Sequence, residues 1–389
     1  MSSKLSFYVH IPYCARRCGY CDFNTYTPSE LSISSDLSGV SRTYIDQLIK
    51  EIEFAHRTLT QDGSHSPITV PTIFFGGGTP TLMEPTDLGR VISAIGNHFD
   101  LANGAEITTE ANPDTVTPAT LEALREAGIN RISFGMQSAA SHVLAALDRT
   151  HKPENVERAV VGARAAGFDE VSVDLIYGAP GESLSDWEAT VDSALALPIT
   201  HISAYALIVE DGTKLGAQVK RGEVVMPDDD ETADKYLLAD EKFIGAGFDW
   251  YELSNWSKPG SHCRHNMAYW NGSNWWGVGP GAHSHVDGRR FWNVKHPRAY
   301  GERINAGADP KADEEFLDAQ ARASENVMLR IRLREGLRIL DLPQSDRLDE
   351  LEDYARAGFI DQESWRENRI VLTRTGRLIA DRIVRSILF

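Results

Sequence analysis

The chain has 389 residues, 42% of them hydrophobic and 24% charged, which is enough for a large apolar core and a second domain. It holds 39 Lys and Arg against 56 Asp and Glu, and the net charge of −17 opposes binding to nucleic acid and anionic lipid. No apolar run approaches the ~18 residues of a membrane span, and the N-terminal residues lack the apolar segment of a signal peptide. We therefore expect a cytoplasmic protein.

Alternating strands and helices are expected over the first two hundred residues. One helix is predicted to begin at Thr117 and Pro118, a capping hydroxyl and a first-turn proline, and to end at Gly128. Alternating units of this length predict an α/β fold with a parallel sheet, and six of them indicate a partial (β/α)6 barrel. The predicted strands are residues 6–10, 72–75, 106–110, 131–135, 171–176 and 201–207.

Two segments are expected to connect larger units. Residues 29–41 contain six serines, and residues 306–310 have the sequence Ala-Gly-Ala-Asp-Pro. We therefore expect a core over residues 1–225, a barrel extension over residues 226–305, and a small C-terminal domain over residues 306–389.

The C-terminal segment has the pattern of a small winged-helix domain: two helices, a hairpin through residues 369–373, and a last helix. Such domains often bind DNA, and Arg330, Arg332, Arg334 and Arg338 favour that interpretation. However, residues 301–389 hold 15 basic against 18 acidic side chains. We therefore expect no binding to nucleic acid.

Three of the four cysteines lie within eight residues, as Cys14-Ala-Arg-Arg-Cys18-Gly-Tyr-Cys21. Thiolates are the usual ligands of iron–sulfur clusters, and three of them leave one iron of a four-iron cluster open. A zinc site would need a fourth ligand such as His10, and zinc motifs usually consist of two separated pairs. Few cysteines and no signal peptide argue against disulfides. The spacing therefore predicts a [4Fe–4S] cluster.

Glycine or polar residues follow several of the predicted strands. The triple glycine 76–78 follows the second strand without the spacing of a pyrophosphate-binding motif. Glu110, Gln137 and Asp174 stand at the ends of otherwise apolar strands. Because the carboxyl ends of parallel strands meet at one edge, these residues are expected to face a common ligand. Each of them alone is equally consistent with an internal salt bridge or a cap.

Together these motifs resemble the radical S-adenosylmethionine (SAM) superfamily, and within it the coproporphyrinogen dehydrogenase-like branch. The resemblance covers roughly residues 5–300 and implies a [4Fe–4S] cluster on Cys14, Cys18 and Cys21, with SAM bound beside it. The residues that it implies as SAM contacts are Tyr8, Tyr20, Gly77, Gly78, Thr79, Glu110, Gln137, Arg149, Asp174, Ala206 and His283.

Two groups within this branch have different functions. The coproporphyrinogen III dehydrogenases carry an N-terminal extension and a further cysteine two positions after the third, where this chain has Phe23. Heme chaperones of the HemW type resemble this chain in both respects. That resemblance implies binding of heme and its transfer to an acceptor protein. The alternative is an oxygen-independent coproporphyrinogen III oxidase of radical SAM type.

A segment near residue 265 carries a second resemblance. His265-Asn-Met-Ala-Tyr269-Trp270 resembles the His-Asn-x-x-Tyr-Trp signature of these chaperones, which implies that His265, Tyr269 and Trp270 bind heme. Five of twelve histidines lie in residues 262–296 and six of eight tryptophans in residues 250–292, and a macrocycle needs aromatic walls and an axial ligand. The alternative is an aromatic core with surface histidines. Cys263 and His262 are alternatives to His265 as the ligand of the heme iron.

The expected partners follow from the same resemblance. They are heme and a heme-accepting apoprotein, either soluble or membrane-bound, and we also consider a homodimer. Whether SAM is cleaved is left open by the residues.

Overall fold

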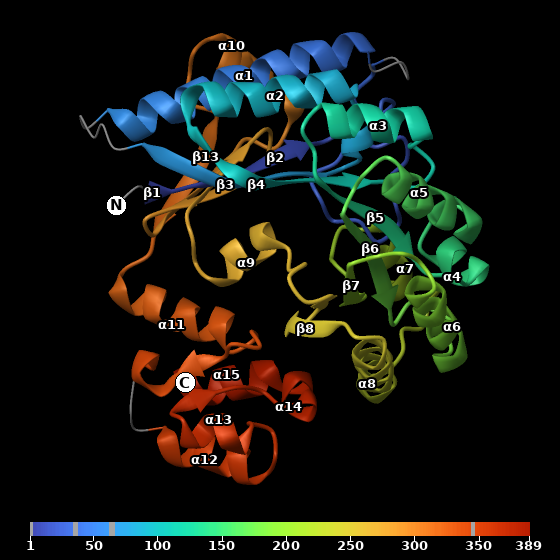
Figure 1. Ribbon diagram of the computed structural model, residues 1–389, viewed down its shortest axis with the longest axis vertical. Coiled ribbons are helices and arrows are strands. Elements are labelled where there is room, and N and C mark those ends of the chain that lie inside the picture. Colours follow the sequence, from blue (N-terminus) through green and yellow to red (C-terminus); the bar gives the residue numbers. More distant parts are fainter. Residues whose placement is uncertain (1–2, 34–37, 62–66, 344–346) are drawn as a thin grey trace.

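The computed structural model describes residues 3–33, 38–61, 67–343 and 347–389. A curved sheet of thirteen strands runs through the upper part of the molecule (Figure 1). Six of its strands are parallel and adjacent in chain order, which confirms the predicted parallel (β/α)6 arrangement. These strands are β2 (Ser6–Ile11), β3 (Ile68–Gly77), β4 (Asp100–Ala111), β5 (Arg131–Gln137), β6 (Glu170–Tyr177) and β7 (His201–Ala206).

Helices cover the outer face of this sheet (Figure 1). They include α1 (Ser38–Thr60), α2 (Pro85–His98), α3 (Pro118–Glu126), α5 (Pro153–Ala165), α6 (Leu184–Leu195) and α8 (Asp229–Gly245). The short helices α4 (Ser141–Ala146) and α7 (Lys214–Lys220) instead contact residues 19–20 of the loop that follows β2. The predicted helix boundaries are confirmed in α3, where Thr117 accepts a hydrogen bond from the Thr120 N–H and Gly128 has a φ of 103°. Along β2, Phe7 and Val9 are fully buried in the main core, whereas Tyr8 is half-buried on the inner face.

The sheet continues beyond the six parallel strands at both edges. Beside β7 lie β9 (Asn255–Ser257) and β8 (Asp249–Glu252), both antiparallel to their neighbours. Beside β2 lies the parallel strand β10 (Trp275–Val278). Antiparallel strands follow it in the order β11 (His283–Val286), β12 (Arg289–Asn293) and β13 (Lys311–Phe316).

Two of the predicted connections differ from the structure. Helix α1 begins at Ser38, so the predicted connection over residues 29–41 is shorter, and residues 34–37 of it lie outside the described residues. Residues 306–310 join α10 (Pro297–Asn305) to β13, and β13 pairs with β12. The sheet therefore extends past residue 306, because its outermost strand lies beyond the predicted linker. The division into three domains stays a prediction.

The C-terminal segment has an apolar core of its own, formed by residues such as Val327, Leu351 and Ile383. Its elements are α11 (Ala319–Arg330), β14 (Leu337–Arg338), α12 (Leu348–Arg356), α13 (Gln362–Arg366), β15 (Arg369–Ile370), α14 (Arg374–Leu378) and α15 (Ala380–Leu388). They form the orange and red lower part of Figure 1. The winged-helix description of this segment stays a prediction. Among the described residues, every helix is too short or too polar to cross a bilayer.

Candidate functional site

The three clustered cysteines lie in the loop that follows β2 and are half-buried. Each thiol has a polar neighbour: Thr79 Oγ1 lies 3.9 Å from Cys14 Sγ, Arg149 Nη1 lies 3.6 Å from Cys18 Sγ, and Thr25 Oγ1 lies 3.9 Å from Cys21 Sγ. Burial raises the pKa of Cys14 to about 11 and also raises the pKa of Cys21. These thiols therefore need a bound cation to become thiolates, as ligation by iron provides.

A zinc site that includes His10 does not fit the geometry. The ring of His10 has both nitrogens bonded, with Nε2 2.9 Å from Asn24 O and Nδ1 3.0 Å from the Tyr8 hydroxyl. Within the described ranges, no three His, Cys, Asp or Glu side chains gather closely enough to share one metal ion. A [4Fe–4S] cluster does not need that convergence, because each thiolate binds a different iron.

The triple glycine brings the end of β3 against the cysteine loop. The N–H of Gly78 donates to Ile11 O at 2.7 Å, and a Cβ on Gly78 would lie 2.5 Å from Tyr13 O. Gly77 has a φ of 107°, and its Cβ would lie 2.4 Å from the His10 ring. These positions therefore require glycine because the two backbone segments approach so closely.

Two carboxyl groups face the inner side of the sheet next to this turn. Glu110 Oε2 accepts a hydrogen bond from the Gly77 N–H at 3.0 Å, and Ser133 donates to Asp174 Oδ1 at 3.0 Å. Burial and the neighbouring Asp174 raise the pKa of Glu110 to about 8. Burial also raises the pKa of Asp174. A bound cation relieves the repulsion between such carboxylates, so the pair suits a positively charged ligand.

Arg149 and Gln137 lie near these carboxyl groups and are both under local constraint. Gln137 has a φ of 63°, in the left-handed region, and follows a bulge after Gly135. Arg149 Nη2 donates to Gly135 O at 2.9 Å, while its buried Nε has no partner among the described residues. Strained backbone and unpaired buried donors both concentrate at ligand sites.

The other predicted SAM residues lie along the same edge of the sheet. Tyr20 is half-buried in the cysteine loop, close to Arg149 and Cys18. Ala206 ends β7, and His283 begins β11 just after the turn that follows β10. His283 is exposed.

The segment with the His-Asn-x-x-Tyr-Trp pattern forms α9 (Arg264–Trp270), which lies inside the curve of the sheet (Figure 1). His265 is only 1% exposed. Its Nδ1 lies 2.7 Å from Thr72 Oγ1 and its Nε2 2.9 Å from the Tyr269 hydroxyl. Its ring stacks on Phe74 with a centroid distance of 5.2 Å. Both ring nitrogens of His265 therefore have hydrogen-bond partners. Trp270, at the end of the helix, is half-buried.

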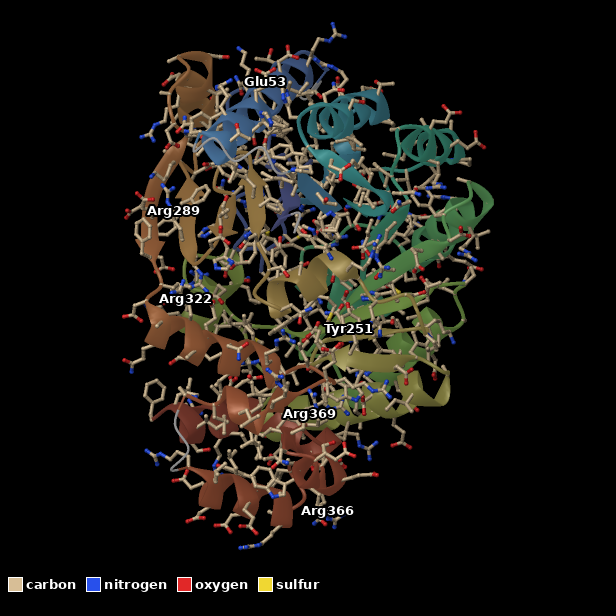
Figure 2. All side chains as sticks on the ribbon, turned by 60° about the vertical axis from the view of Figure 1, so that its left-hand side comes forward. Glu53, Tyr251, Arg289, Arg322, Arg366 and Arg369 are labelled. Carbon is tan, nitrogen blue, oxygen red and sulfur yellow. The ribbon has the colours of Figure 1, made fainter. Side chains whose placement is uncertain are left out.

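Cys263 and His262, the other candidate ligands of the heme iron, differ in their exposure to solvent. Cys263 is buried 3.6 Å from Glu106, and its burial raises its pKa to about 12. His262 is exposed and stacks on the buried Tyr251 at 4.5 Å, near the centre of the view in Figure 2. Two of the clustered tryptophans, Trp256 and Trp276, are packed in the main core. Part of the tryptophan-rich segment over residues 250–292 therefore belongs to the apolar core, in line with the alternative to a heme site.

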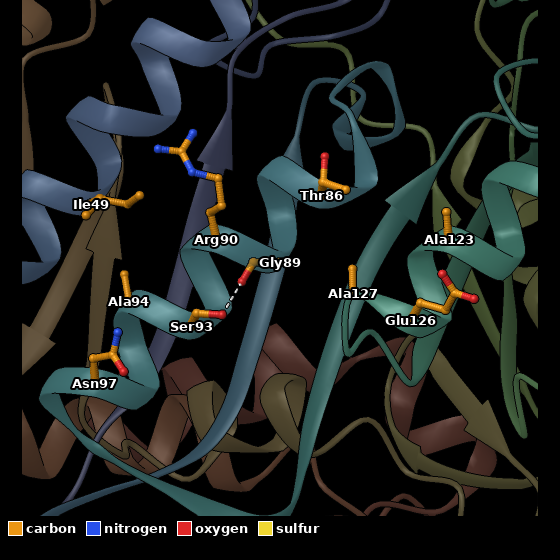
Figure 3. Close-up of a pocket in the computed structure, with 10 residues that line it drawn as sticks. All are labelled: Ile49, Thr86, Gly89, Arg90, Ser93, Ala94, Asn97, Ala123, Glu126 and Ala127. Carbon is orange, nitrogen blue, oxygen red and sulfur yellow. Dashed lines mark hydrogen bonds between the residues drawn. The ribbon is translucent and has the colours of Figure 1, made fainter.

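A surface hollow of about 590 Å³ lies on the helical side of the molecule, between α1, α2 and α3 (Figure 3). Its lining includes Ile49, Arg90, Ala94 and Glu126, and none of the predicted site residues. It is therefore separate from the inner face of the sheet that carries the candidate site.

Comparison with known proteins identifies the family. Residues 8–194 match the radical SAM superfamily. The heme chaperone HemW of Mycobacterium tuberculosis is 45% identical over 382 residues, covering 98% of this chain and 94% of that protein. HemW of Bacillus subtilis is 31% identical, covering 97% of each chain. The chain belongs to the HemW family of radical SAM proteins.

A solved structure agrees on the fold. Coproporphyrinogen III oxidase (HemN) from Escherichia coli, a radical SAM enzyme, matches with a TM-score of 0.82 over 99% of this chain and 90% of its own. Because the identity is 21%, this likeness supports the fold alone. Membership of the radical SAM superfamily implies a [4Fe–4S] cluster and SAM as cofactors. The cysteine loop, the paired carboxyl groups and the unpaired Arg149 Nε fit those groups.

Sequence reasoning missed the residues that hold the HemW signature segment in place. Glu106 on β4 accepts hydrogen bonds from the N–H groups of Arg264 and His265, at 2.9 and 2.8 Å. Thr72 on β3 bonds the His265 ring. On β4, Glu106, Thr108 and Glu110 are polar residues at alternate positions, whereas on β3 Thr72 is followed two positions later by the apolar Phe74. That alternation was the signal for an inward-facing polar surface.

Proposed function

We propose that this chain is a heme chaperone, which binds heme and passes it to an acceptor protein. One observation carries the proposal: relatives named heme chaperone HemW match it along nearly its whole length, at up to 45% identity. The sheet edge with its cysteine loop would hold the [4Fe–4S] cluster and SAM beside the heme.

The cysteine loop supports a chaperone over an oxidase. The dehydrogenases that this chain resembles have a further cysteine at the position of Phe23, and Phe23 here is 64% exposed. An exposed phenyl group cannot ligate iron but can contact an apolar ligand or a partner protein. In this proposal Cys14, Cys18 and Cys21 hold the cluster. Tyr8, Glu110, Gln137, Arg149 and Asp174 are among the SAM contacts.

The partners and location belong to the same proposal. We propose that heme is the cargo, that an apoprotein accepts it in the cytoplasm or at a membrane, and that two copies of the chain associate during transfer. The acidic net charge of −17 favours an acceptor with a basic docking surface.

Anaerobic reconstitution of the full chain with iron and sulfide, followed by two parallel assays, tests this function. We expect about one hemin bound per chain and no conversion of coproporphyrinogen III to protoporphyrinogen IX. Each of Cys14→Ala, Cys18→Ala and Cys21→Ala should lose the cluster, whereas Cys263→Ala should keep it. Turnover of coproporphyrinogen, or failure to bind hemin, would overturn the chaperone assignment.

A further inference from the structure

Glu51 on α1 is a fully buried carboxyl group that holds the turn between β10 and β11. Its Oε2 accepts hydrogen bonds from the Gly279 N–H at 2.7 Å and from the Tyr300 hydroxyl of α10 at 2.6 Å. Its Oε1 accepts from the Asn293 amide at 2.7 Å. The helices α1 and α10 lie side by side at the top of Figure 1. Because all three partners donate, they match an ionised carboxylate better than a protonated one.

The turn over residues 279–281 packs against the end of β2. Tyr44, also on α1, donates its hydroxyl to His10 O. A Cβ on Gly279 would lie 2.8 Å from that hydroxyl and 2.9 Å from His10 O, and Gly279 has a φ of 106°. One helix therefore holds the end of β2 and the turn side by side, at a distance that requires glycine.

The same turn is tied to the cysteine loop. Asn24 follows Cys21 in that loop, and its Nδ2 donates to Pro280 O at 3.0 Å. The main-chain oxygen of Asn24 lies 2.9 Å from His10 Nε2. On its other side the turn leads into β11, whose first residue, His283, is a predicted SAM contact. The turn thus joins the loop of the predicted cluster to the predicted SAM site.

The pKa of Glu51 lies in the neutral range. Burial raises it to about 7, although the three hydrogen-bond donors lower it, and the nearby Asp309 also raises it. Between about pH 6 and about pH 8 the carboxyl group therefore changes from mostly protonated to mostly ionised. Since only the ionised form accepts from all three donors, the turn is held more firmly as pH rises through this range.

Other titratable and charged groups also face Glu51. They are Tyr44 of α1, Tyr300 of α10, Asp309, Arg289 of β12 and Lys311 of β13. Burial raises the pKa of both tyrosines well above the usual value, so both stay neutral. The two cations pair with Glu314. The change of charge in the neutral range therefore falls on Glu51.

A small cavity connects Glu51 to the surface. It measures about 20 Å³, which is room for one water molecule, and the exposed Asp309 is part of its lining. Trp276 also lines it, and the buried Trp276 Nε1 has no partner among the described residues. A proton can therefore reach Glu51 from solvent without unfolding of the barrel.

We propose that Glu51 is a positioning residue of the cofactor site, whose carboxylate holds the turn over residues 279–281 against the cysteine loop in the arrangement that binds SAM. The inference rests on the proposed SAM site and adds a residue that is not among its predicted contacts. Glu51 acts through the turn and Asn24. Binding of SAM and ionisation of Glu51 accordingly favour each other.

SAM titration of the full chain, reconstituted with iron and sulfide, tests the inference at about pH 6 and about pH 8. The readouts are the dissociation constant of SAM and the change that SAM makes in the electron paramagnetic resonance spectrum of the reduced cluster. The amide of Glu51→Gln stands for the protonated carboxyl group. We expect this variant to bind SAM about tenfold more weakly than the wild type at about pH 8, but only about twofold more weakly at about pH 6. That is the effect of a one-unit shift in the pKa of Glu51 on SAM binding.

Two further variants control this comparison. Glu53→Gln changes a half-buried carboxyl group on the same helix, labelled in Figure 2, and should bind SAM as the wild type does at both pH values. Tyr300→Phe removes a hydroxyl that lowers the pKa of Glu51 and should move the midpoint of the pH profile to higher pH. Titration of SAM itself and of Glu110 occurs in every chain and cancels in the ratios of dissociation constants.

The outcomes separate the positioning role from the SAM site. No SAM binding by the wild type would reject the proposed site itself. A ratio between Glu51→Gln and the wild type that is the same at both pH values would reject the positioning role alone, because a purely structural loss does not follow the charge of Glu51. Tyr300→Phe keeps the carboxylate and tests the same role if Glu51→Gln does not fold. An unchanged midpoint in Tyr300→Phe would also reject it.

Discussion

The backbone N–H of His265 donates to Glu106 Oε1 at 2.8 Å, across 159 positions of the chain. Glu106 also accepts from the Arg264 N–H at 2.9 Å and from the Cys263 thiol. The first N–H groups of a helix lack partners within it, and Cys263 at the N-cap of α9 supplies no side-chain cap. A carboxylate on β4 therefore caps α9 from outside and fixes it to the inner face of the sheet.

Removal of this anchor should destabilise the protein. Glu106→Ala leaves two buried donors and one partly buried donor without this acceptor, and we expect a loss of about 1–3 kcal/mol or more in the free energy of unfolding. Urea unfolding of the cluster-free chain measures it. Glu106→Gln keeps an oxygen acceptor and should cost less. Equal stabilities of Glu106→Ala and the wild type would show that α9 is held by other contacts.

His265 should behave as a structural residue. His265→Ala removes its bonds to Thr72 and Tyr269 and its contact with Phe74, and we expect a loss of at least about 2 kcal/mol in unfolding free energy. His262→Ala, at an exposed position, should stay within about 0.5 kcal/mol of the wild type. A changed hemin spectrum without a loss of stability would instead mark His265 as a heme contact.

The sequence allowed the strands and the cluster to be predicted because their signals are local. Short, mostly apolar segments mark the strands from β2 to β7, and the spacing of Cys14, Cys18 and Cys21 needs only a short loop. The polar strand ends were likewise expected at one edge, since parallel strands share a direction. The role of residues 306–310 is harder to predict, because Gly and Pro mark a turn within a domain as readily as a linker between domains.

The surroundings of His265 could not be predicted from the sequence. Its partners Thr72 and Glu106 lie on two earlier strands, and their contact depends on how α9 folds back onto the sheet. Within a motif that resembles a ligand site in sequence, the imidazole of His265 thus has a hydrogen-bond partner on each nitrogen. The stacking of His283 on Trp292 depends equally on the pairing of β11 with β12.

Glu110 should make stability depend on pH. Its pKa of about 8 in the folded chain exceeds the value of about 4.3 expected when unfolded. Between these values the folded state holds a proton that the unfolded state releases, so stability falls as pH rises from about 5 to about 8. Glu110→Gln removes this contribution.

Urea unfolding of the cluster-free wild type and Glu110→Gln at several pH values measures the difference. We expect the wild type to lose stability relative to the variant by up to about 1.4 kcal/mol per pH unit in this range. Buried carboxyl groups that do not interact with Glu110, such as Glu51, contribute to both chains and cancel in the comparison. Parallel profiles would show that Glu110 is ionised in the folded chain at these pH values.

A buried ion pair joins the C-terminal segment to the barrel. Arg377 on α14 donates to both oxygens of Asp240 on α8, at 2.8 and 2.7 Å, and both side chains are almost fully buried. The Trp256 indole N–H also donates to Asp240, and the Arg377 guanidinium lies 4.4 Å from the Trp250 ring centroid. The two apolar cores therefore meet at one desolvated charge pair.

Breaking this pair should cost more than breaking an exposed one, since either partner left alone is an uncompensated buried charge. We expect Arg377→Ala to lose about 3–5 kcal/mol of unfolding free energy. Arg356→Ala, which removes exposed pairs with Glu352 and Asp353, should lose no more than about 0.5 kcal/mol. Hydrogen exchange should locate the loss in Arg377→Ala at α14 and α15, where the segment would detach first. Equal protection there in both variants would mean that apolar contacts alone hold the segment to the barrel.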